Sequence, residues 1–213
     1  KVFGFFIAMF CIFVSTNAQQ KVRMETTQGT IDFILYDETP KHKSNFMKLV
    51  SEGYYNGLLF HRVIPKFMIQ GGDPESKNAS ATRGLGNGGP GYTLGAEIKP
   101  QFIHKKGALA AARQPDSENP KLRSNGSQFY FVQGSVYPRK YLKRFEEKNG
   151  ITYTEKQKID YETLGGTPHL DGLYTVFGEI IRGLDVLEKI SQVETRRGDR
   201  PVKDVRIISV KLI

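Results

Sequence analysis

The side chains best suited to chemistry lie in one short run, from Phe60 to Asp73. Arg62 and Gln70 bring a guanidinium and a carboxamide into a stretch dominated by large apolar residues. A charged side chain rarely occupies such surroundings without a partner or a ligand. The run therefore indicates a binding site that works through hydrogen bonds in a partly dry setting. The alternative is structural, with Arg62 extending to solvent from a strand edge and Phe67 packed in the core.

Other chemistries find little support in the sequence. The four histidines, His42, His61, His104 and His169, lack the spacing of metal ligands, so no metal site is predicted. The only cysteine is Cys11, and no Gly-x-Ser-x-Gly motif supplies a serine nucleophile. Most acidic residues lie next to lysines, which gives weak support to a pair of catalytic carboxylates. No nucleotide or redox cofactor is indicated, and the remaining site suits chemistry without covalent steps.

Residues 1–18 are expected to form a signal peptide. Val2 to Val14 is almost wholly apolar, Lys1 precedes it, and small residues follow as far as Ala18. This order is typical of a secretory leader, and cleavage would leave Gln19 as the first residue. The protein would then be exported, either periplasmic or secreted, with no cysteine. An uncleaved anchor is the alternative, although the run is short for a membrane span.

The net charge of +9 indicates solubility rather than a nucleic-acid partner. Basic residues are scattered among acidic ones, and no basic stripe interleaved with aromatic residues is present. Once the leader is removed, no membrane association is expected either.

Residues 19–213 are expected to form one domain made mainly of strands. Short apolar runs separated by Gly, Asn and Pro predict many strands, which favours a closed barrel or a sandwich. Two flanking helices are predicted. One begins at Pro40 with Thr39 as its N-cap, and the other covers Leu184 to Val193.

The segment at about 138–166 interrupts the pattern of strands. Tyr141 to Lys148 is typical of a helix, and Thr154 with Gln157 resembles a capping box at the start of a second helix. We interpret the segment as an inserted helical hairpin that is solvated and without function. The alternative is that it recruits a partner or a client.

Four blocks of sequence resemble one family. The run from Phe60 to Asp73 closely resembles the signature of the cyclophilin-type peptidyl-prolyl cis-trans isomerases. Gly107 to Arg113, Ser124 to Tyr130 and His169 to Gly178 resemble three further blocks of that family, in the same order. The resemblance covers about residues 22 to 213 apart from the helical insertion. It implies a closed eight-stranded antiparallel barrel capped by two helices, with a substrate groove on the outside of the barrel.

The resemblance also implies a role for each matching residue. Arg62 would be the catalytic arginine, acting with Phe67 and Gln70. The substrate-binding residues would be Met68, Ala112, Arg113, Gln128, Tyr130, His169, Leu170 and Tyr174, with Phe129 behind the groove. The protein would be a monomer that isomerises X-Pro bonds of exported polypeptides and assists their folding, without a cofactor. The rival is a binding module that grips proline-containing segments without turnover, and the intact Arg62 favours the enzyme.

The sequence departs from the family pattern at four positions. His169 stands where family members that bind cyclosporin well have tryptophan, so weak cyclosporin binding is expected. Tyr174 replaces a histidine, and Tyr130 replaces a phenylalanine and adds a hydroxyl to the pocket wall. Arg113 stands where asparagine is common, and its longer side chain would still reach the peptide backbone.

Overall fold

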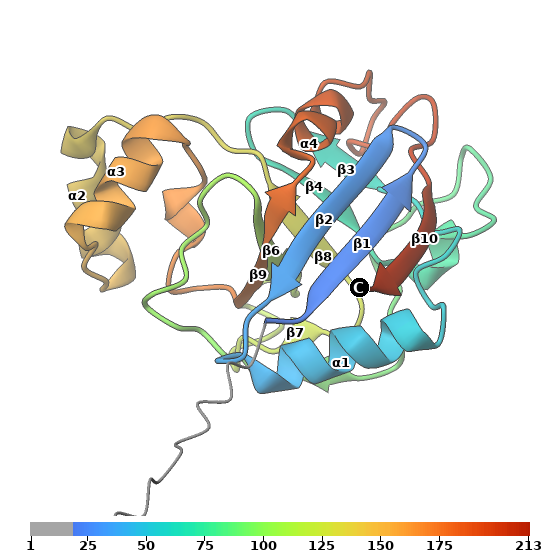
Figure 1. Cartoon of the computed structure of the whole chain (residues 1–213), viewed down its shortest axis with the longest axis horizontal. Helices are drawn as coiled ribbons and strands as arrows, with labels where there is room; N and C mark the ends of the chain where they lie inside the picture. Colours follow the sequence, from blue (N-terminus) through green and yellow to red (C-terminus); the bar gives the residue numbers. More distant parts are fainter. Residues whose placement is uncertain (1–18) are drawn as a thin grey trace, which may run out of the picture.

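The computed structural model describes residues 19–213 (Figure 1), so the predicted signal peptide lies outside the described residues. The elements, in chain order, are β1 (Lys21–Thr26), β2 (Gly29–Leu35), α1 (Pro40–Ser51), β3 (Arg62–Ile64), β4 (Met68–Gly71), β5 (Thr93–Leu94), β6 (Ala108–Ala111), β7 (Ser124–Asn125), β8 (Phe129–Val132), α2 (Arg139–Asn149), α3 (Glu155–Thr163), β9 (Val176–Arg182), α4 (Leu184–Ser191) and β10 (Ile207–Leu212). Two short 3-10 turns, η1 (Pro74–Ser76) and η2 (Pro168–Leu170), complete the list. None of the helices in this part of the chain is long and apolar enough to span a membrane.

Eight strands form one curled antiparallel sheet in the order β10-β1-β2-β9-β6-β8-β4-β3. The prediction of a closed barrel is wrong, because β10 and β3 are the two edges of this sheet and form no ladder with each other. The remaining strands, β5 and β7, pair separately. The fold is therefore an open half-barrel, mainly β, with four α-helices in the described residues.

The short length of β3 explains why the sheet stays open. Pro65 has no N–H to continue a ladder, and Lys66 turns the chain with a φ of 63°. The residues that face the other edge come before β3, where the backbone N–H of Phe60 donates to the carbonyl of Val205 at 2.9 Å. Isolated backbone hydrogen bonds thus cross the seam in place of a regular ladder.

The sheet curls around an aromatic core. Phe33, Phe129 and Phe131 are buried and meet edge to face, with ring centroids 5.3 to 5.7 Å apart in the two pairs that include Phe131. Helices α1 and α4 cover opposite ends of the sheet (Figure 1) and contribute Phe46 and Leu187 to this core. Truncating one of these rings to alanine would cost about 3–5 kcal/mol. The core therefore fixes the strands whose outer face carries the site.

Thr39 is the N-cap residue of α1 and Pro40 begins the helix, as predicted, but the Thr39 side chain forms no capping hydrogen bond. The Thr39 hydroxyl donates to the Tyr36 carbonyl instead of accepting from the helix. The first N–H groups of the helix donate to the Glu97 carboxylate, with distances of 3.1 Å from Lys41 and 2.9 Å from His42. A carboxylate far away in the sequence therefore accepts the hydrogen bonds from the helix N-terminus that the Thr39 side chain was expected to accept.

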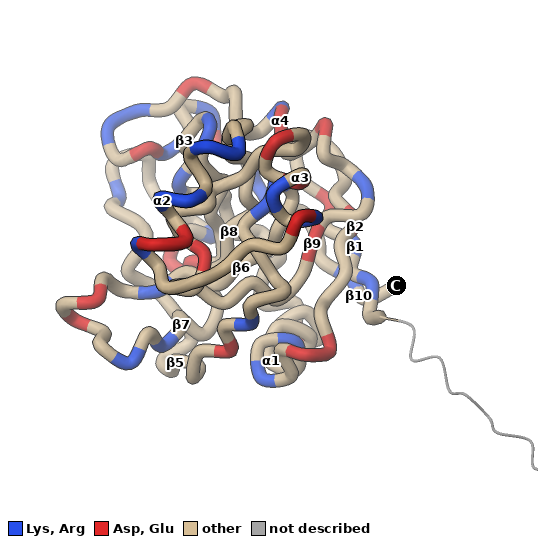
Figure 2. Tube along the Cα trace, turned by 90° about the vertical axis from the view of Figure 1, so that its left-hand side faces the viewer, with Lys and Arg blue, Asp and Glu red and all other residues tan. Residues whose placement is uncertain are grey.

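The predicted helical hairpin is present as α2 and α3, which project from one side of the sheet (Figure 1). Gly150 ends α2 in the left-handed conformation, and Thr154 and Gln157 form the predicted capping box of α3. The hairpin has a small core of its own, built from Ile103, Leu142, Tyr153 and Tyr161. Lys, Arg, Asp and Glu are interspersed along the chain on the face shown in Figure 2.

Candidate active site

A small pocket opens on the outer face of the sheet, with a volume of about 140 Å³. We call it the apolar pocket. Its lining consists of Arg62, Phe67, Met68, Gln70, Ala112, Arg113, Tyr130, Leu170 and Tyr174. The structure thus brings together every predicted site residue except Gln128 and His169, which lie next to this set.

The antiparallel register explains why these residues meet. Arg62 on β3 is paired with Gln70 on β4, and Gln70 is paired with Tyr130 on β8. Paired residues of an antiparallel sheet point to the same face, and their immediate neighbours point to the other. Accordingly Val63 and Ile69 pack in the aromatic core, while Arg62, Gln70 and Tyr130 share the outer face.

Arg62 is oriented by an ion pair at the surface. Its Nε donates to Oδ2 of Asp199 at 3.2 Å, and the two side chains are 43% and 44% exposed. An exposed pair of this kind contributes at most about 1 kcal/mol to stability. Among the described residues no acceptor binds the two Nη groups of Arg62, so these donors remain available beside the pocket. Sequence reasoning missed Asp199, because no local pattern links residues 137 positions apart.

Gln70 is held by a second amide. The Nε2 of Gln70 donates to Oε1 of Gln128 at 2.9 Å, and Gln128 donates in turn to the carbonyls of Gly86 and Gly88 at 2.9 and 2.7 Å. Gln128 is buried, so it supports Gln70 and lines a neighbouring hollow of about 280 Å³ rather than the apolar pocket. The carboxamide of Gln70 is therefore presented at the junction of the two hollows.

One wall of the pocket is apolar and backed by a histidine. The His169 ring lies against Phe67, with centroids 5.5 Å apart and an interplanar angle of 34°. Burial lowers the pKa of His169, so the ring is neutral near pH 7. His169 thus packs against Phe67 without lining the pocket, while Leu170 lines the pocket itself.

Arg113 and Tyr174 form the opposite rim. The guanidinium carbon of Arg113 lies 4.3 Å from the centroid of the Tyr174 ring. Its Nε donates to the Leu173 carbonyl at 3.0 Å, and its Nη1 pairs with Asp116 at 2.6 Å. These contacts leave the side chain 3% exposed, so the guanidinium stiffens the rim instead of extending toward solvent.

Two polar residues behind the pocket were not anticipated. The Tyr130 hydroxyl lies 3.0 Å from Nε2 of His104, and Nδ1 of His104 lies 2.7 Å from Oδ1 of Asp171. All three side chains are buried. The signal in the sequence was Tyr130 itself, because a buried tyrosine hydroxyl in place of phenylalanine needs a partner.

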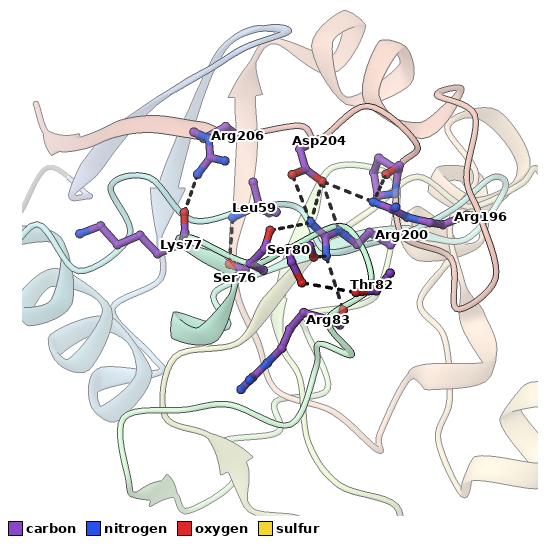
Figure 3. Close-up of polar contacts among 12 residues, drawn as sticks. Leu59, Ser76, Lys77, Ser80, Thr82, Arg83, Arg196, Arg200, Asp204 and Arg206 are labelled. Carbon is purple, nitrogen blue, oxygen red and sulfur yellow. Dashed lines mark hydrogen bonds and ion pairs between the residues drawn. The ribbon is translucent and has the colours of Figure 1, made fainter.

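A larger hollow of about 580 Å³ adjoins the pocket on the Arg62 side. We call it the arginine hollow, after its lining residues Arg62, Arg83, Arg196, Arg197 and Arg200. Figure 3 shows how Arg200 joins two loops: it pairs with Asp204 at 3.0 Å and donates to the Ser80 carbonyl at 2.8 Å. The hollow is therefore a built feature of the fold, with its loops held together by the buried Arg200.

Comparison with known proteins identifies the family. The family model described as cyclophilin type peptidyl-prolyl cis-trans isomerase/CLD matches residues 21–212. A peptidyl-prolyl cis-trans isomerase of Arabidopsis thaliana is 34% identical over 90% of this chain and 94% of its own length. A Streptococcus pyogenes protein whose name combines a phosphatase with a peptidyl-prolyl cis-trans isomerase is 38% identical over 90% of this chain. The match spans only 38% of that longer protein.

Solved structures agree with this result. The crystal structure of a cyclophilin type peptidyl-prolyl cis-trans isomerase from Cryptosporidium parvum is similar with a TM-score of 0.67 and 27% identity, covering 92% of this chain and 98% of the other. A second structure of that protein, determined in the presence of the dipeptide Ala-Pro, has a TM-score of 0.65. With its half-barrel and its apolar pocket beside Arg62, this chain belongs to the cyclophilin-type peptidyl-prolyl cis-trans isomerase family.

Proposed function

We propose that this isomerase acts on X-Pro bonds of exported polypeptides, assists their folding, and uses Arg62 to stabilise the twisted imide. The observation that carries the mechanism is the position of Arg62. Its terminal N–H groups have no acceptor among the described residues, and its side chain lines a pocket walled by Phe67, Met68 and Leu170.

The reaction requires one hydrogen-bond donor beside the proline nitrogen. The barrier to rotation of the peptide bond is about 18–20 kcal/mol, because rotation breaks amide resonance. In the twisted state the proline nitrogen becomes pyramidal and gains a lone pair that accepts a hydrogen bond. A donor aimed at that nitrogen binds the twisted state more tightly than either planar state, which lowers the barrier. Arg62 supplies the donor without losing its proton.

The other pocket residues have supporting roles in this proposal. Phe67, Met68, Leu170 and Tyr130 hold the proline ring and exclude water, which strengthens the hydrogen bond from the guanidinium. Gln70 and Ala112 bind the peptide backbone on one side of the bond, while Gln128 holds Gln70 in place and Arg113 stiffens the rim. Tyr174 shapes the rim, and His169 supports the Phe67 wall. The step requires no acid, base or nucleophile.

The rival function, a proline-binding module without turnover, predicts a different result in one experiment. Exchange between the cis and trans forms of a short Ala-Pro peptide is measured by NMR with the protein at low concentration, and the dissociation constant of the same peptide is measured by titration. We expect acceleration of exchange at enzyme concentrations far below that of the peptide. Binding with no acceleration would support the binding module and contradict the proposal.

Export is the second part of the proposal. The apolar run from Val2 to Val14 and the small residues up to Ala18 support a cleaved leader. The whole chain, with a start codon, is expressed in a secreting host, and the product in the exported fraction is sequenced from its N-terminus. We expect Gln19 or a near neighbour as the first residue. Retention of the whole chain inside the cell would contradict export.

A further inference from the structure

The helical hairpin is joined to the apolar pocket by a continuous chain of buried hydrogen bonds. Its members, which we call the buried network, are Tyr130, His104, Asp171, Tyr153 and Tyr161. Asp171 is central: its Oδ1 lies 2.7 Å from Nδ1 of His104, and its Oδ2 accepts from the hydroxyls of Tyr153 at 2.7 Å and Tyr161 at 2.5 Å. At the other end, His104 contacts the hydroxyl of Tyr130 in the pocket lining.

The buried network has a fixed pattern of donors. Burial raises the pKa of Tyr130, Tyr153 and Tyr161 well above the usual range, so their hydroxyls keep their protons. Asp171 then accepts from both hairpin tyrosines and from His104. Hydrogen bonds to a carboxylate in a dry interior are strong and directional. The network therefore links the hairpin to the pocket lining through hydrogen bonds that are all buried.

The hairpin also holds a second wall of the pocket. The Nδ2 of Asn149, the last residue of α2, donates to the Asp171 carbonyl at 2.9 Å. Asp171 follows directly on the turn η2, which carries His169 and Leu170. The hairpin thus touches the supports of both the Tyr130 wall and the Leu170 wall. A solvated excursion without function would need neither contact.

We propose that the hairpin is a positioning element of the active site, in which Tyr161 and Tyr153 act through Asp171 and His104 to set the place of Tyr130. This inference rests on the proposed function only in assuming that the apolar pocket binds proline. It also gives a reason for the hydroxyl of Tyr130, which connects the pocket to the insertion.

A double-mutant cycle tests the proposal. Tyr130→Phe and Tyr161→Phe each remove one hydroxyl from the network and leave the ring in place. We expect each single change to raise KM for a proline peptide by roughly threefold to tenfold with little change in kcat, because a misplaced wall weakens binding of the proline ring. The double variant is expected to be no worse than the more affected single variant, since both changes break the same connection.

A control variant separates a change in pocket geometry from a general loss of folded protein. Tyr137→Phe is the matched control, because Tyr137 packs in the same hairpin core and its hydroxyl has no hydrogen-bond partner among the described residues. It should leave KM and kcat unchanged. A purely structural role of Tyr161 would reduce the fraction of folded enzyme, and so kcat, without changing KM.

Two results would overturn the inference: unchanged KM in both single variants, or effects that simply multiply in the double variant. If the wild type shows no catalysis, the proposed function fails, and the same cycle measured on the dissociation constant of the peptide still decides the role of the hairpin.

The arginine hollow supports a second, independent inference. It is lined by five arginines and by no acidic residue. Arg62, Arg83, Arg196 and Arg200 pair with carboxylates outside the lining, whereas Arg197 is exposed and forms no ion pair with any described residue. The hollow therefore has cationic donors that the protein itself does not satisfy.

Buried donors point the same way. His61 lines the hollow, is 3% exposed, and has no hydrogen-bond partner at either ring nitrogen. The Nε of Arg196 is also buried without a partner. Buried polar groups in folded proteins are nearly always paired. The Nε–H of Arg196 and the single N–H of the neutral His61 ring are therefore two buried donors at this hollow that lack an acceptor.

We infer that the arginine hollow binds an acidic side chain of the polypeptide whose proline occupies the apolar pocket. The two cavities share Arg62 and Gln70, so a single extended peptide can reach both. This inference deepens the proposed function, because it names acidic residues near proline as a preferred feature of the substrate.

Paired peptides test this preference. Each pair differs only by Glu or Gln at one position on either side of the X-Pro unit, and kcat/KM is measured for every pair. We expect the wild type to favour Glu by about fivefold at one or more positions, the size of a modest ion pair. The preference should fall at high salt and disappear in Arg197→Gln, with neutral peptides unaffected.

Arg144→Gln is the matched control, because Arg144 is an exposed arginine of α2 outside the hollow. It should retain the preference for Glu. Equal rates on Glu and Gln peptides in the wild type, or a preference that survives both Arg197→Gln and Arg83→Gln, would overturn the inference. Failure on neutral peptides too would instead reject the proposed function.

Discussion

The two sides of the apolar pocket are built differently. On one side, Arg62 pairs with Asp199 at the surface, where both side chains remain well exposed. On the other side, Tyr130 is tied to His104 and Asp171, which are almost completely buried. One side therefore presents a charged donor to solvent, and the other fixes a wall from within.

This difference matches what each side has to do. A surface ion pair is worth at most about 1 kcal/mol, so the guanidinium of Arg62 can turn onto a substrate at little cost. A buried network with every donor paired is much harder to distort, so Tyr130 keeps its place while the imide twists. Tighter binding of the twisted state than of the planar state needs a hydrogen-bond donor that can reorient and pocket walls that stay rigid.

The largest expected effect comes from replacing the aspartate on each side of the pocket, Asp171 or Asp199, by asparagine. Asp171→Asn should lower the free energy of unfolding by about 3–5 kcal/mol, because it removes the charge that several buried donors share. Asp199→Asn, the matched surface change, should cost less than about 1 kcal/mol. Urea unfolding of both variants checks this. Equal losses in the two variants would show that the sides do not differ as described.

His61 is a deeply buried histidine on the arginine side. Burial lowers its pKa from 6.5 to about 4. Between these pH values the unfolded chain binds a proton at this residue and the folded chain does not. The corresponding stability, roughly 3 kcal/mol, is therefore present above pH 6.5 and lost as the pH falls to about 4.

His61→Gln removes that contribution, so the variant should lose about 2–3 kcal/mol less than the wild type when the pH falls from 7 to 4.5. Urea unfolding at several pH values provides the measurement. His42 and His169, whose pKa values are also lowered by burial, remain in both proteins and cancel in the comparison. Parallel pH profiles would mean that His61 gains a proton equally in both states.

A smaller effect is expected at the rim. We predict weak cyclosporin binding by the wild type, and His169→Trp should strengthen it by roughly tenfold, since an indole adds an N–H donor and a larger flat surface. Isothermal titration with the two proteins checks the change. Tight binding of cyclosporin by the wild type would show that tryptophan is not needed at position 169 and would contradict the prediction.

The site residues could be predicted because four blocks of the sequence resemble one family. The structure adds the reason why Arg62, Gln70 and Tyr130 share a face, which is their pairing on neighbouring antiparallel strands. The two helices and the capping box of Thr154 and Gln157 were also readable, because caps and apolar spacing act within a few residues.

What escaped prediction depends on contacts between distant residues. The open seam between β3 and β10 results from how two edges meet, and the closed barrel was an expectation from resemblance. The Glu97 carboxylate accepts hydrogen bonds from the start of α1 that the Thr39 hydroxyl was expected to accept. Asp199 likewise pairs with Arg62 although the two residues are far apart in the sequence. The role of the hairpin was likewise hidden, because Tyr161 and Asp171 meet only through tertiary packing.

The most direct test of the account compares wild type with Arg62→Ala in two measurements on one proline peptide. Protease-coupled turnover reports kcat/KM, and a titration reports the dissociation constant. The account predicts that kcat/KM falls by about 100-fold or more while the dissociation constant changes by less than about threefold, since Arg62 acts mainly on the twisted state. Turnover close to that of the wild type in a folded Arg62→Ala protein would contradict it.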